Sequence, residues 1–323
     1  MSAVLKEEPK RAHVRDVVLV TGADLAGKAV EMLSSHELVY AGKTPTEDDL
    51  VALCRQHQPV AIIVRYGRIT ERVIEACTRL RVISKHGSGT DTIDKEAAAR
   101  RGIAVKAAVG ANAAAVAEHA WALIFACAKD VPLLDRRMHE GRWDKATHKS
   151  LELKGRTLGL VGLGAIGARV ATVGSALGMQ VIAHDPFAQT APDGVSLLPL
   201  ADVIAQSDVL SLHCPLTKDN ANMLNAQTLA TMRPGAIVVN TARGGLIDEA
   251  ALAEALRSGT LRAAGLDSFQ VEPFTPGHPF TGIPNAILSP HIGGVTGDAY
   301  VGMGTAAAAN VLAVLEQEAG QQA

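Results

Sequence analysis

A glycine-rich segment near the middle of the chain has the spacing of a phosphate-binding turn. Gly162, Gly164 and Gly167 directly follow an apolar, strand-like run and open a stretch of helical composition. In such a turn the first glycine permits a sharp bend, the second lets the backbone approach a pyrophosphate, and the third lets helix and strand pack closely. The free N–H groups at the start of the helix attract phosphate. We therefore predict a dinucleotide site here, which includes Ala165 and Ile166.

An acidic residue at the end of the next predicted strand completes the pattern. Asp185 lies 18 positions after Gly167, close to the expected offset of about 20. A carboxylate at this point accepts hydrogen bonds from both ribose hydroxyls and repels a 2′-phosphate. Residues 186–188 contain no arginine that would attract one. The sequence therefore predicts NAD, rather than NADP, as the cofactor.

The elements that position this turn alternate between strand and helix along most of the chain. The strand-like runs are continuously apolar, as is typical of parallel strands buried on both faces. Helical patterns lie between them, for example at 165–177 and at 249–257, where Asp248 is a suitable N-cap. This alternation indicates parallel sheets in α/β layers. The clearest predicted strands are 17–21, 60–64, 157–161, 181–183, 209–212 and 237–240.

Two such series are present, one over residues 16–106 and one that begins near residue 157. A long helical pattern at 112–141 connects them, and a last helix at 296–318 follows the second series. We expect that last helix to return to the first domain. The prediction is an α/β chain of two Rossmann-like or flavodoxin-like, doubly wound parallel-sheet domains with a cleft between them. Their predicted bounds are 1–107 plus 293–323 for a substrate-binding domain, and 108–292 for a NAD-binding domain.

Composition excludes several classes of protein. The 323 residues carry a formal net charge of −2, which gives no electrostatic basis for binding nucleic acid or an anionic membrane. The charged start of the chain lacks the apolar core of a signal peptide, which predicts a cytoplasmic location. The longest apolar stretch, 111–128, is interrupted by Glu118 and His119 and is expected to be a buried helix. No disulfide or metal site is expected, because no CxxC pair or compact Cys/His cluster includes Cys54, Cys77, Cys127 or Cys214.

Further motifs carry a resemblance to a known family. They are HGSGTD at 86–91, GAN at 110–112 with VAEH at 116–119, LHCPLT at 212–217, VNTARGGLID at 239–248, GLDSFQVEP at 265–273 and SPHIGG at 289–294. In order and content they resemble those of the D-isomer-specific 2-hydroxyacid dehydrogenases, which include phosphoglycerate dehydrogenases and glyoxylate/hydroxypyruvate reductases. The similarity covers about residues 60 to 312.

The resemblance implies roles for individual residues. Arg243 would hold the substrate carboxylate, and Glu272 and His291 would form an acid–base pair. Arg65, Ser88, Gly89 and Asn112 would make further substrate contacts, and Asp267 would lie near the nicotinamide carboxamide. The implied cofactor contacts are Gly162, Gly164, Ala165, Ile166, Gly167, Asp185, His213, Pro215, Thr217, Thr241, Ala242, Asp267, His291 and Gly293.

These residue types suit the reduction of a 2-oxo acid, in which a hydride reaches the carbonyl carbon and a proton reaches its oxygen. A histidine suits the proton donor because its unperturbed pKa of about 6.5 lies near cellular pH. A neighbouring carboxylate favours the imidazolium form. The planar fork of an arginine grips a carboxylate through two parallel hydrogen bonds. The expected activity is NAD-dependent interconversion of a small D-2-hydroxy acid and its 2-oxo acid, of the hydroxypyruvate/glyoxylate reductase or 3-phosphoglycerate dehydrogenase type.

Two alternatives stay open at this stage: a NAD(H)-sensing protein like the C-terminal binding protein corepressors, and an enzyme like phosphite dehydrogenase. Formate dehydrogenases carry glutamine where this chain has Glu272, which argues against that branch. The substrate is also open. Arg65, Arg68 and Lys85 could meet a phosphate or could be surface charges, whereas the small residues at 87–89 favour a short acid.

Other expectations concern the remaining side chains and the assembly. Cys214, like His213, is expected to line the cofactor site, and His119 and Trp121 are expected to be packing residues. The other histidines are expected at the surface. A small-molecule 2-oxo or 2-hydroxy acid is the expected partner, and the family suggests a homodimer built on the cofactor domain.

Overall fold

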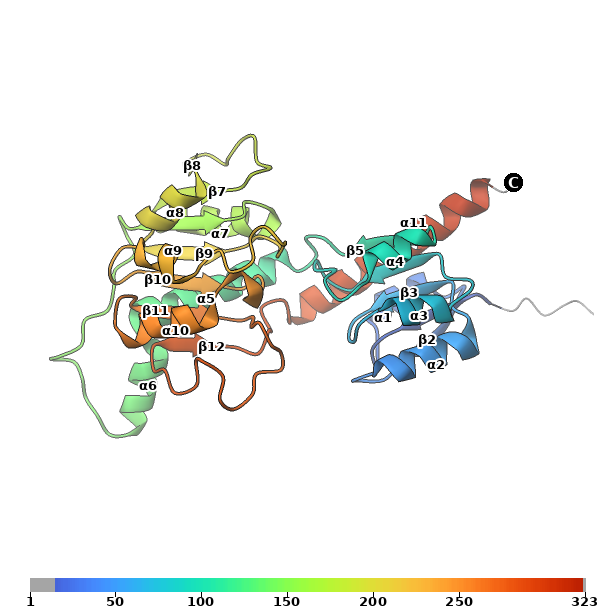
Figure 1. Ribbon diagram of the computed structural model, residues 1–323, viewed down its shortest axis with the longest axis horizontal. Helices are drawn as coiled ribbons and strands as arrows, with labels where there is room; N and C mark the ends of the chain where they lie inside the picture. Colours follow the sequence, from blue (N-terminus) through green and yellow to red (C-terminus); the bar gives the residue numbers. More distant parts are fainter. Residues whose placement is uncertain (1–14, 322–323) are drawn as a thin grey trace, which may run out of the picture. The chain divides into compact units, whose positions relative to one another are not determined.

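The computed structural model describes residues 15–321, so the charged start of the chain considered above lies outside it. The described residues up to Ala111 and from Tyr300 onward form one compact unit, and Asn112–Ala299 form a second. The predicted boundaries, 107/108 and 292/293, fall four and seven residues before these divisions. Figure 1 shows an α/β arrangement in each unit.

The first unit is built on a five-stranded parallel sheet in the order β2-β1-β3-β4-β5. Because β1 pairs with both β2 and β3, the strand order reverses at β1, as in a doubly wound fold. The strands are β1 (Val17–Val20), β2 (Glu37–Tyr40), β3 (Ala61–Val64), β4 (Val82–Lys85) and β5 (Ala104–Ala107). The helices between them are α1 (Gly27–Met32), α2 (Glu47–His57), α3 (Glu71–Ala76) and α4 (Lys95–Arg100).

The second unit is built on a seven-stranded parallel sheet in the order β12-β11-β10-β9-β6-β7-β8. Its order reverses at β6, which pairs with β7 on one side and β9 on the other. The strands are β6 (Thr157–Val161), β7 (Gln180–His184), β8 (Val195–Leu197), β9 (Val209–Leu212), β10 (Ile237–Asn240), β11 (Ala263–Leu266) and β12 (Ala286–Leu288). The connecting helices are α7 (Ala165–Ala176), α8 (Leu200–Gln206), α9 (Ala226–Ala230), the short 3-10 turn η1 (Gly244–Leu246) and α10 (Glu249–Arg257).

Successive residues of a strand pack into two different hydrophobic cores, one on each face of the sheet. Val209, Ile237 and Val239 belong to a cluster that also contains Trp121, whereas their neighbours Leu210 and Val238 belong to a cluster on the other face. A strand covered on both faces must be apolar at every position, which is why these strands read as continuous apolar runs. The predicted fold class, two doubly wound parallel-sheet domains, is confirmed.

The connection between the two sheets differs from the single long helix predicted at 112–141. It consists of α5 (Ala113–Lys129) and α6 (Val131–His139). Asp130, between them, has a left-handed backbone with φ of +55°, and Pro132 lies in the first turn of α6. Proline is accommodated in a first turn but cannot continue a helix, because it lacks the N–H group that the helix needs.

The last helix, α11 (Gly297–Gln321), belongs largely to the first unit. Its residues Ala307, Ala308, Val311 and Val314 are buried in one cluster with strand residues such as Val18 and Val82. Among the described residues α11 alone, over Gly297–Gln317, is long and apolar enough to cross a membrane. That is weak evidence, because the core helix of a soluble protein has the same length and composition.

The packing of α11 gives a stability prediction. Replacing Val311, which is fully buried, with alanine removes two buried methyl groups and leaves a cavity. The Val311→Ala variant should lose about 2 kcal/mol in free energy of unfolding, measured by urea denaturation. Val301→Ala, at an exposed position of the same helix, is the control and should change little. Equal losses in the two variants would show that this face of α11 does not pack as described.

Candidate active site

The glycine-rich turn joins β6 to α7, and its glycines have different environments. Gly162 has a φ of +97°, and a Cβ atom added there would lie 2.7 Å from the carbonyl carbon of His213. A Cβ atom on Gly167 would lie 2.1 Å from the carbonyl oxygen of Gly162. A Cβ atom on Gly164 would meet nothing within 4 Å. The first and third glycines therefore serve the turn and the packing, whereas the second leaves space for a ligand at the start of α7.

Asp185 lies beside this turn, at the end of β7. Its Oδ2 accepts a hydrogen bond of 2.8 Å from the backbone N–H of Leu163, and its Oδ1 accepts one of 2.9 Å from that of Phe187. Each carboxylate oxygen keeps a lone pair for a further donor. The carboxylate is thus held against the glycine turn by backbone contacts and can still accept from ribose hydroxyls.

His213, Cys214, Pro215 and Thr217 follow β9. Burial lowers the pKa of His213 to about 4, so its ring is neutral at neutral pH, and its Nε2 lies 2.9 Å from the hydroxyl of Ser211. Burial raises the pKa of the Cys214 thiol to about 11. Neither residue is therefore suited to carry a charge or act as a nucleophile near pH 7. The structure is consistent with a lining role.

Arg243 follows β10 in a turn held by Asn240. The Asn240 side chain accepts from the N–H of Ala242 at 2.9 Å and donates to the carbonyl oxygen of Arg243 at 2.9 Å. Thr241, like Ala242, lies in this turn. A Cβ atom on Gly244 would lie 1.9 Å from the carbonyl carbon of Phe269, so the chain after Arg243 packs directly on the segment that follows β11.

His291 and Glu272 are in contact although 19 positions separate them in the sequence. The Nδ1 atom of His291 lies 2.8 Å from Oε2 and 3.0 Å from Oε1 of Glu272. Oε1 also accepts a hydrogen bond of 3.0 Å from the backbone N–H of Phe269. His291 has a left-handed backbone with φ of +54°, which a residue with a side chain adopts only when its surroundings hold it there.

The carboxylate of Asp267, which is 2% exposed, provides much of that support. Its Oδ1 accepts from the backbone N–H of Ile292 at 2.9 Å and from the hydroxyl of Ser289 at 2.6 Å. Its Oδ2 accepts from the N–H of Gly293 at 2.8 Å. The residues on both sides of His291 are therefore fixed by one carboxylate.

His119 of α5 completes this group. Its Nε2 lies 2.8 Å from the hydroxyl oxygen of Ser289 and 3.3 Å from Oδ1 of Asp267. An ionised carboxylate only accepts, so the hydroxyl of Ser289 donates to Asp267 and accepts from His119. The proton of a neutral His119 ring must accordingly lie on Nε2.

The remaining predicted substrate contacts lie in two places. Arg65 follows β3, and Ser88 and Gly89 follow β4, all in the first unit. Asn112 lies at the start of the second unit, where a Cβ atom on Gly294 would be 2.5 Å from its amide nitrogen. Among the described residues, no group of three or more His, Cys, Asp and Glu side chains could hold a metal ion.

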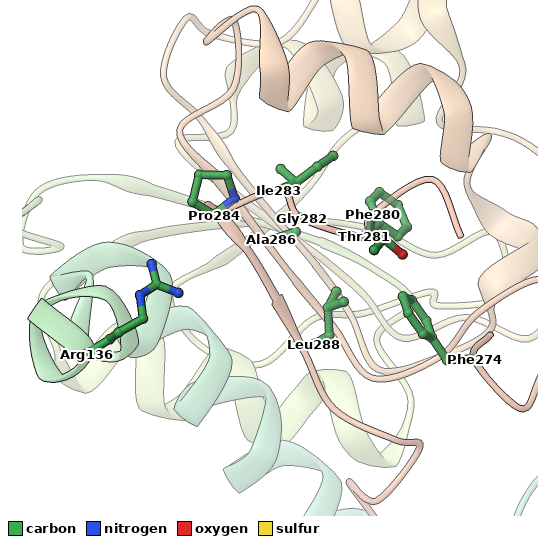
Figure 2. Close-up of a pocket in the computed structure, with 9 residues that line it drawn as sticks. All are labelled: Arg136, Phe274, Phe280, Thr281, Gly282, Ile283, Pro284, Ala286 and Leu288. Atoms are coloured by element: carbon green, nitrogen blue, oxygen red, sulfur yellow. The ribbon is translucent and has the colours of Figure 1, made fainter. Parts of the chain in front are cut away.

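A hollow of about 540 Å³ lies elsewhere in the second unit (Figure 2). Its lining comes from α6, from β12 and from the loop before β12, and consists of Arg136, Phe274, Phe280, Thr281, Gly282, Ile283, Pro284, Ala286 and Leu288. None of Arg243, Glu272 and His291 lines it. This mostly apolar hollow is therefore separate from the candidate catalytic residues.

Comparisons with known proteins identify the family. Residues 121–293 match the family described as "D-isomer specific 2-hydroxyacid dehydrogenase, NAD binding domain". A hydroxypyruvate reductase of Thermotoga maritima is 38% identical over 90% of this chain and 93% of the relative. The chain belongs to the D-isomer-specific 2-hydroxyacid dehydrogenases. Residues 121–293 are the NAD-binding domain of this member of the family.

Two further relatives show how far the similarity extends. A D-3-phosphoglycerate dehydrogenase of Archaeoglobus fulgidus is 40% identical over 89% of this chain, but over only 55% of the relative. The chain thus spans about half the length of the phosphoglycerate dehydrogenases that it matches. The crystal structure of the TT0316 protein of Thermus thermophilus has 38% sequence identity and a TM-score of 0.86, over 93% of this chain and 97% of the other.

Several side chains of this chain lie in surroundings that the sequence did not predict. Trp121 is a buried packing residue, as predicted, but His119 takes part in the polar group around Asp267. The expectation that the other histidines are at the surface is wrong for His86 and His278, which are buried. His278 lies 3.2 Å from Glu249 and stacks on the ring of Phe274. The position of His119 beside Glu118 in a mostly apolar helix was the signal that the sequence offered for it.

The Asp267 group predicts the dynamics of the loop that carries His291. Ser289→Ala removes one hydrogen bond to Asp267 and the acceptor for His119. The backbone N–H groups of Ile292 and Gly293 should then exchange with solvent deuterium about tenfold faster. Ser150→Ala is a matched control, because Ser150 makes a similar contact of 3.1 Å with His148 away from this group. Unchanged protection in Ser289→Ala would show that the serine does not stabilise the loop.

Proposed function

We propose that this protein is a NAD-dependent dehydrogenase that interconverts a small D-2-hydroxy acid and its 2-oxo acid. The observation that carries the proposal is the contact of His291 Nδ1 with both carboxylate oxygens of Glu272, in a unit that also holds a dinucleotide-binding turn. A family relative is named hydroxypyruvate reductase and others are named D-3-phosphoglycerate dehydrogenase. Both names describe chemistry at a carbon next to a carboxylate.

Each residue has a defined task in this proposal. Bound NAD(H) supplies or accepts the hydride. Since Nδ1 of His291 is in contact with the carboxylate of Glu272, Nε2 is the ring nitrogen that exchanges a proton with the substrate. In the reducing direction Nε2 gives its proton to the carbonyl oxygen, and in the oxidising direction it takes the proton of the hydroxyl. The two contacts with Glu272 fix the orientation of the ring.

Arg243 is proposed to hold the substrate carboxylate. A guanidinium can bind both carboxylate oxygens at once, which fixes the face of the carbonyl carbon that meets the nicotinamide. The turn held by Asn240 sets the backbone from which Arg243 extends. Asn112 of the same unit, and Arg65, Ser88 and Gly89 of the first unit, are proposed as further substrate contacts.

The oriented histidine favours an enzyme over a NAD(H)-sensing binding protein. Sensing requires that the dinucleotide be bound, but it requires no acid–base pair. Here the backbone of His291 is held in a left-handed conformation by Asp267, and its ring is held by Glu272. This arrangement supports proton transfer.

We also expect a homodimer that uses the second unit, where Val131, Met138 and Trp143 are exposed. The mass of the protein in solution would test this expectation.

His291→Gln tests the proton-transfer role. Glutamine can still form hydrogen bonds but cannot deliver a proton as imidazolium does. The turnover number for reduction of 2-oxo acids should fall by about 10²–10⁴-fold, whereas the affinity for NADH, followed by its fluorescence, should stay close to that of the wild type. His148→Gln, at a histidine outside the candidate site, controls for the loss of an imidazole. Near wild-type turnover in His291→Gln would refute the role.

Asp185→Asn tests the proposed preference for NAD over NADP. The amide keeps an oxygen that accepts from the N–H of Leu163 but lacks the charge that repels a 2′-phosphate. The ratio of kcat/KM for NADP to kcat/KM for NAD should rise about tenfold. Asp193→Asn, at an exposed acid after the same strand, should leave the ratio unchanged. A wild-type enzyme that uses NADP as well as NAD would contradict the proposal.

A further inference from the structure

A second charged group lies in the first unit, where the chain leaves β1, β3 and β4. We call it the Arg65 cluster, and it consists of Asp24, Arg65, His86 and Tyr300. The Nη1 atom of Arg65 donates to the backbone carbonyl oxygen of Asp24 at 2.6 Å and forms an ion pair with the Oδ1 atom of that residue. The hydroxyl of Tyr300 donates to the same Oδ1 atom at 3.0 Å. One carboxylate thus engages both side chains.

The guanidinium of Arg65 is held in place on several sides. Its central carbon lies 5.3 Å from the ring centre of Tyr66 and 5.0 Å from that of Tyr300, within the range of cation–π attraction. A Cβ atom on Gly22 would lie 2.9 Å from Cδ of Arg65, so the glycine leaves room for the side chain. Only 12% of the Arg65 side chain is exposed, compared with 69% for Asp24. The arginine is fixed, and the acid faces solvent.

The carboxyl group of Asp24 carries a negative charge at neutral pH. The hydrogen bonds from Arg65 and Tyr300 hold the pKa of its carboxyl group below the usual value. The carboxylate is therefore ionised at neutral pH, and it places a negative charge directly beside the positive charge of Arg65.

The other basic side chains nearby do not restore a strongly positive surface. Burial and, to a smaller extent, the charge of Arg65 lower the pKa of His86 to about 4, so His86 is neutral at pH 7. The ammonium group of Lys85 donates to the backbone carbonyl oxygen of Arg65 at 3.3 Å. Arg68 lines a separate hollow of about 180 Å³ together with Asp91 and Asp94. Of the three basic residues that could have met a phosphate, two thus have acidic residues nearby.

From this geometry we propose that Asp24 is a specificity residue that disfavours phosphorylated substrates. The inference rests on the proposed function and on Arg65 being a substrate contact. A dianionic phosphate brought to Arg65 would meet the carboxylate of Asp24 on the same guanidinium, and the two like charges would repel each other. A hydroxyl group or a hydrogen atom at that end of the substrate carries no such penalty. The cluster therefore fits glyoxylate or hydroxypyruvate better than 3-phosphohydroxypyruvate.

The test compares Asp24→Asn with the wild type. Asparagine keeps an oxygen that accepts from Arg65 and Tyr300 but removes the negative charge. The wild type should have a higher kcat/KM for hydroxypyruvate than for 3-phosphohydroxypyruvate. Asp24→Asn should raise the ratio of phosphorylated to unphosphorylated kcat/KM by about tenfold and should lower the inhibition constant of inorganic phosphate. Both shifts should shrink at high ionic strength, because Asp24 is exposed and its charge is screened.

Asp48→Asn is the matched control. Asp48 forms an ion pair of 2.6 Å with Arg72 in the same unit and is 78% exposed, so the change removes the same charge from a similar pair outside the cluster. A wild type that prefers 3-phosphohydroxypyruvate would overturn the inference, as would equal ratios in the wild type and both variants. If the wild type reduces no 2-oxo acid at all, the proposed function fails, and the inference fails with it.

Discussion

The candidate active site depends on the hydrogen bonds that the buried carboxylate of Asp267 accepts. Removing a charge from water costs several kcal/mol unless hydrogen bonds compensate. Asp267 accepts three hydrogen bonds, from the hydroxyl of Ser289 and from the N–H groups of Ile292 and Gly293. Asp267 follows β11 and Ser289 follows β12, and these strands are paired and parallel. The carboxylate therefore joins the carboxyl ends of two neighbouring strands and sustains the left-handed backbone of His291, a strain of about 1–3 kcal/mol.

The same short segment also positions the other candidate catalytic residues. Just after Asp267, the N–H of Phe269 donates to Glu272, and the N–H of Gln270 donates to Glu249 of α10 at 2.8 Å. Gly244, the residue after Arg243, packs on the backbone of Phe269 and Gln270. Residues 267–270 thus contact the three places from which Arg243, Glu272 and His291 extend. A change in this segment would displace all three together, so their effects on catalysis should not be independent.

How well each feature could be predicted depends on the kind of force that determines it. The strands 157–161, 209–212 and 237–240 and the helix 249–257 with its Asp248 cap have the predicted bounds, because burial on two faces and a cap both leave local patterns. The edge strands β2, β8 and β12 are partly exposed, and none of them was among the predicted strands. The interior strands β4 and β11 are buried but were not among the predicted strands either. The helix break at Asp130 has a sequence signal in Pro132, which the prediction of one long helix did not take into account.

The candidate active site likewise contains features that the local sequence determines and features that it does not. The glycine turn and Asp185 are local in sequence, and their structure follows from the spacing. The contact between Glu272 and His291 depends on how the chain returns after β12, so only the resemblance to a family indicated it. His86 and His278 were wrongly predicted at the surface because burial of a histidine is a property of its neighbours in space. Nothing in their own sequence positions distinguishes a solvated imidazole from one beside Tyr300 or Phe274.

Solvent exposure also explains why three aspartates that follow parallel strands have different proposed roles. Asp24, Asp185 and Asp267 each lie where a parallel strand has ended, the edge of a sheet where ligands bind in α/β proteins. Asp267 is buried, so its hydrogen bonds are all made within the protein and it acts by fixing a loop. Asp185 is half-buried: the backbone holds it, and it keeps lone pairs for a ligand. Asp24 is mostly exposed, so its charge is felt by whatever approaches Arg65. In the proposed function, the same residue type at the carboxyl edge of a parallel sheet thus fixes a loop, binds the ribose or repels a phosphate, according to how much water it retains.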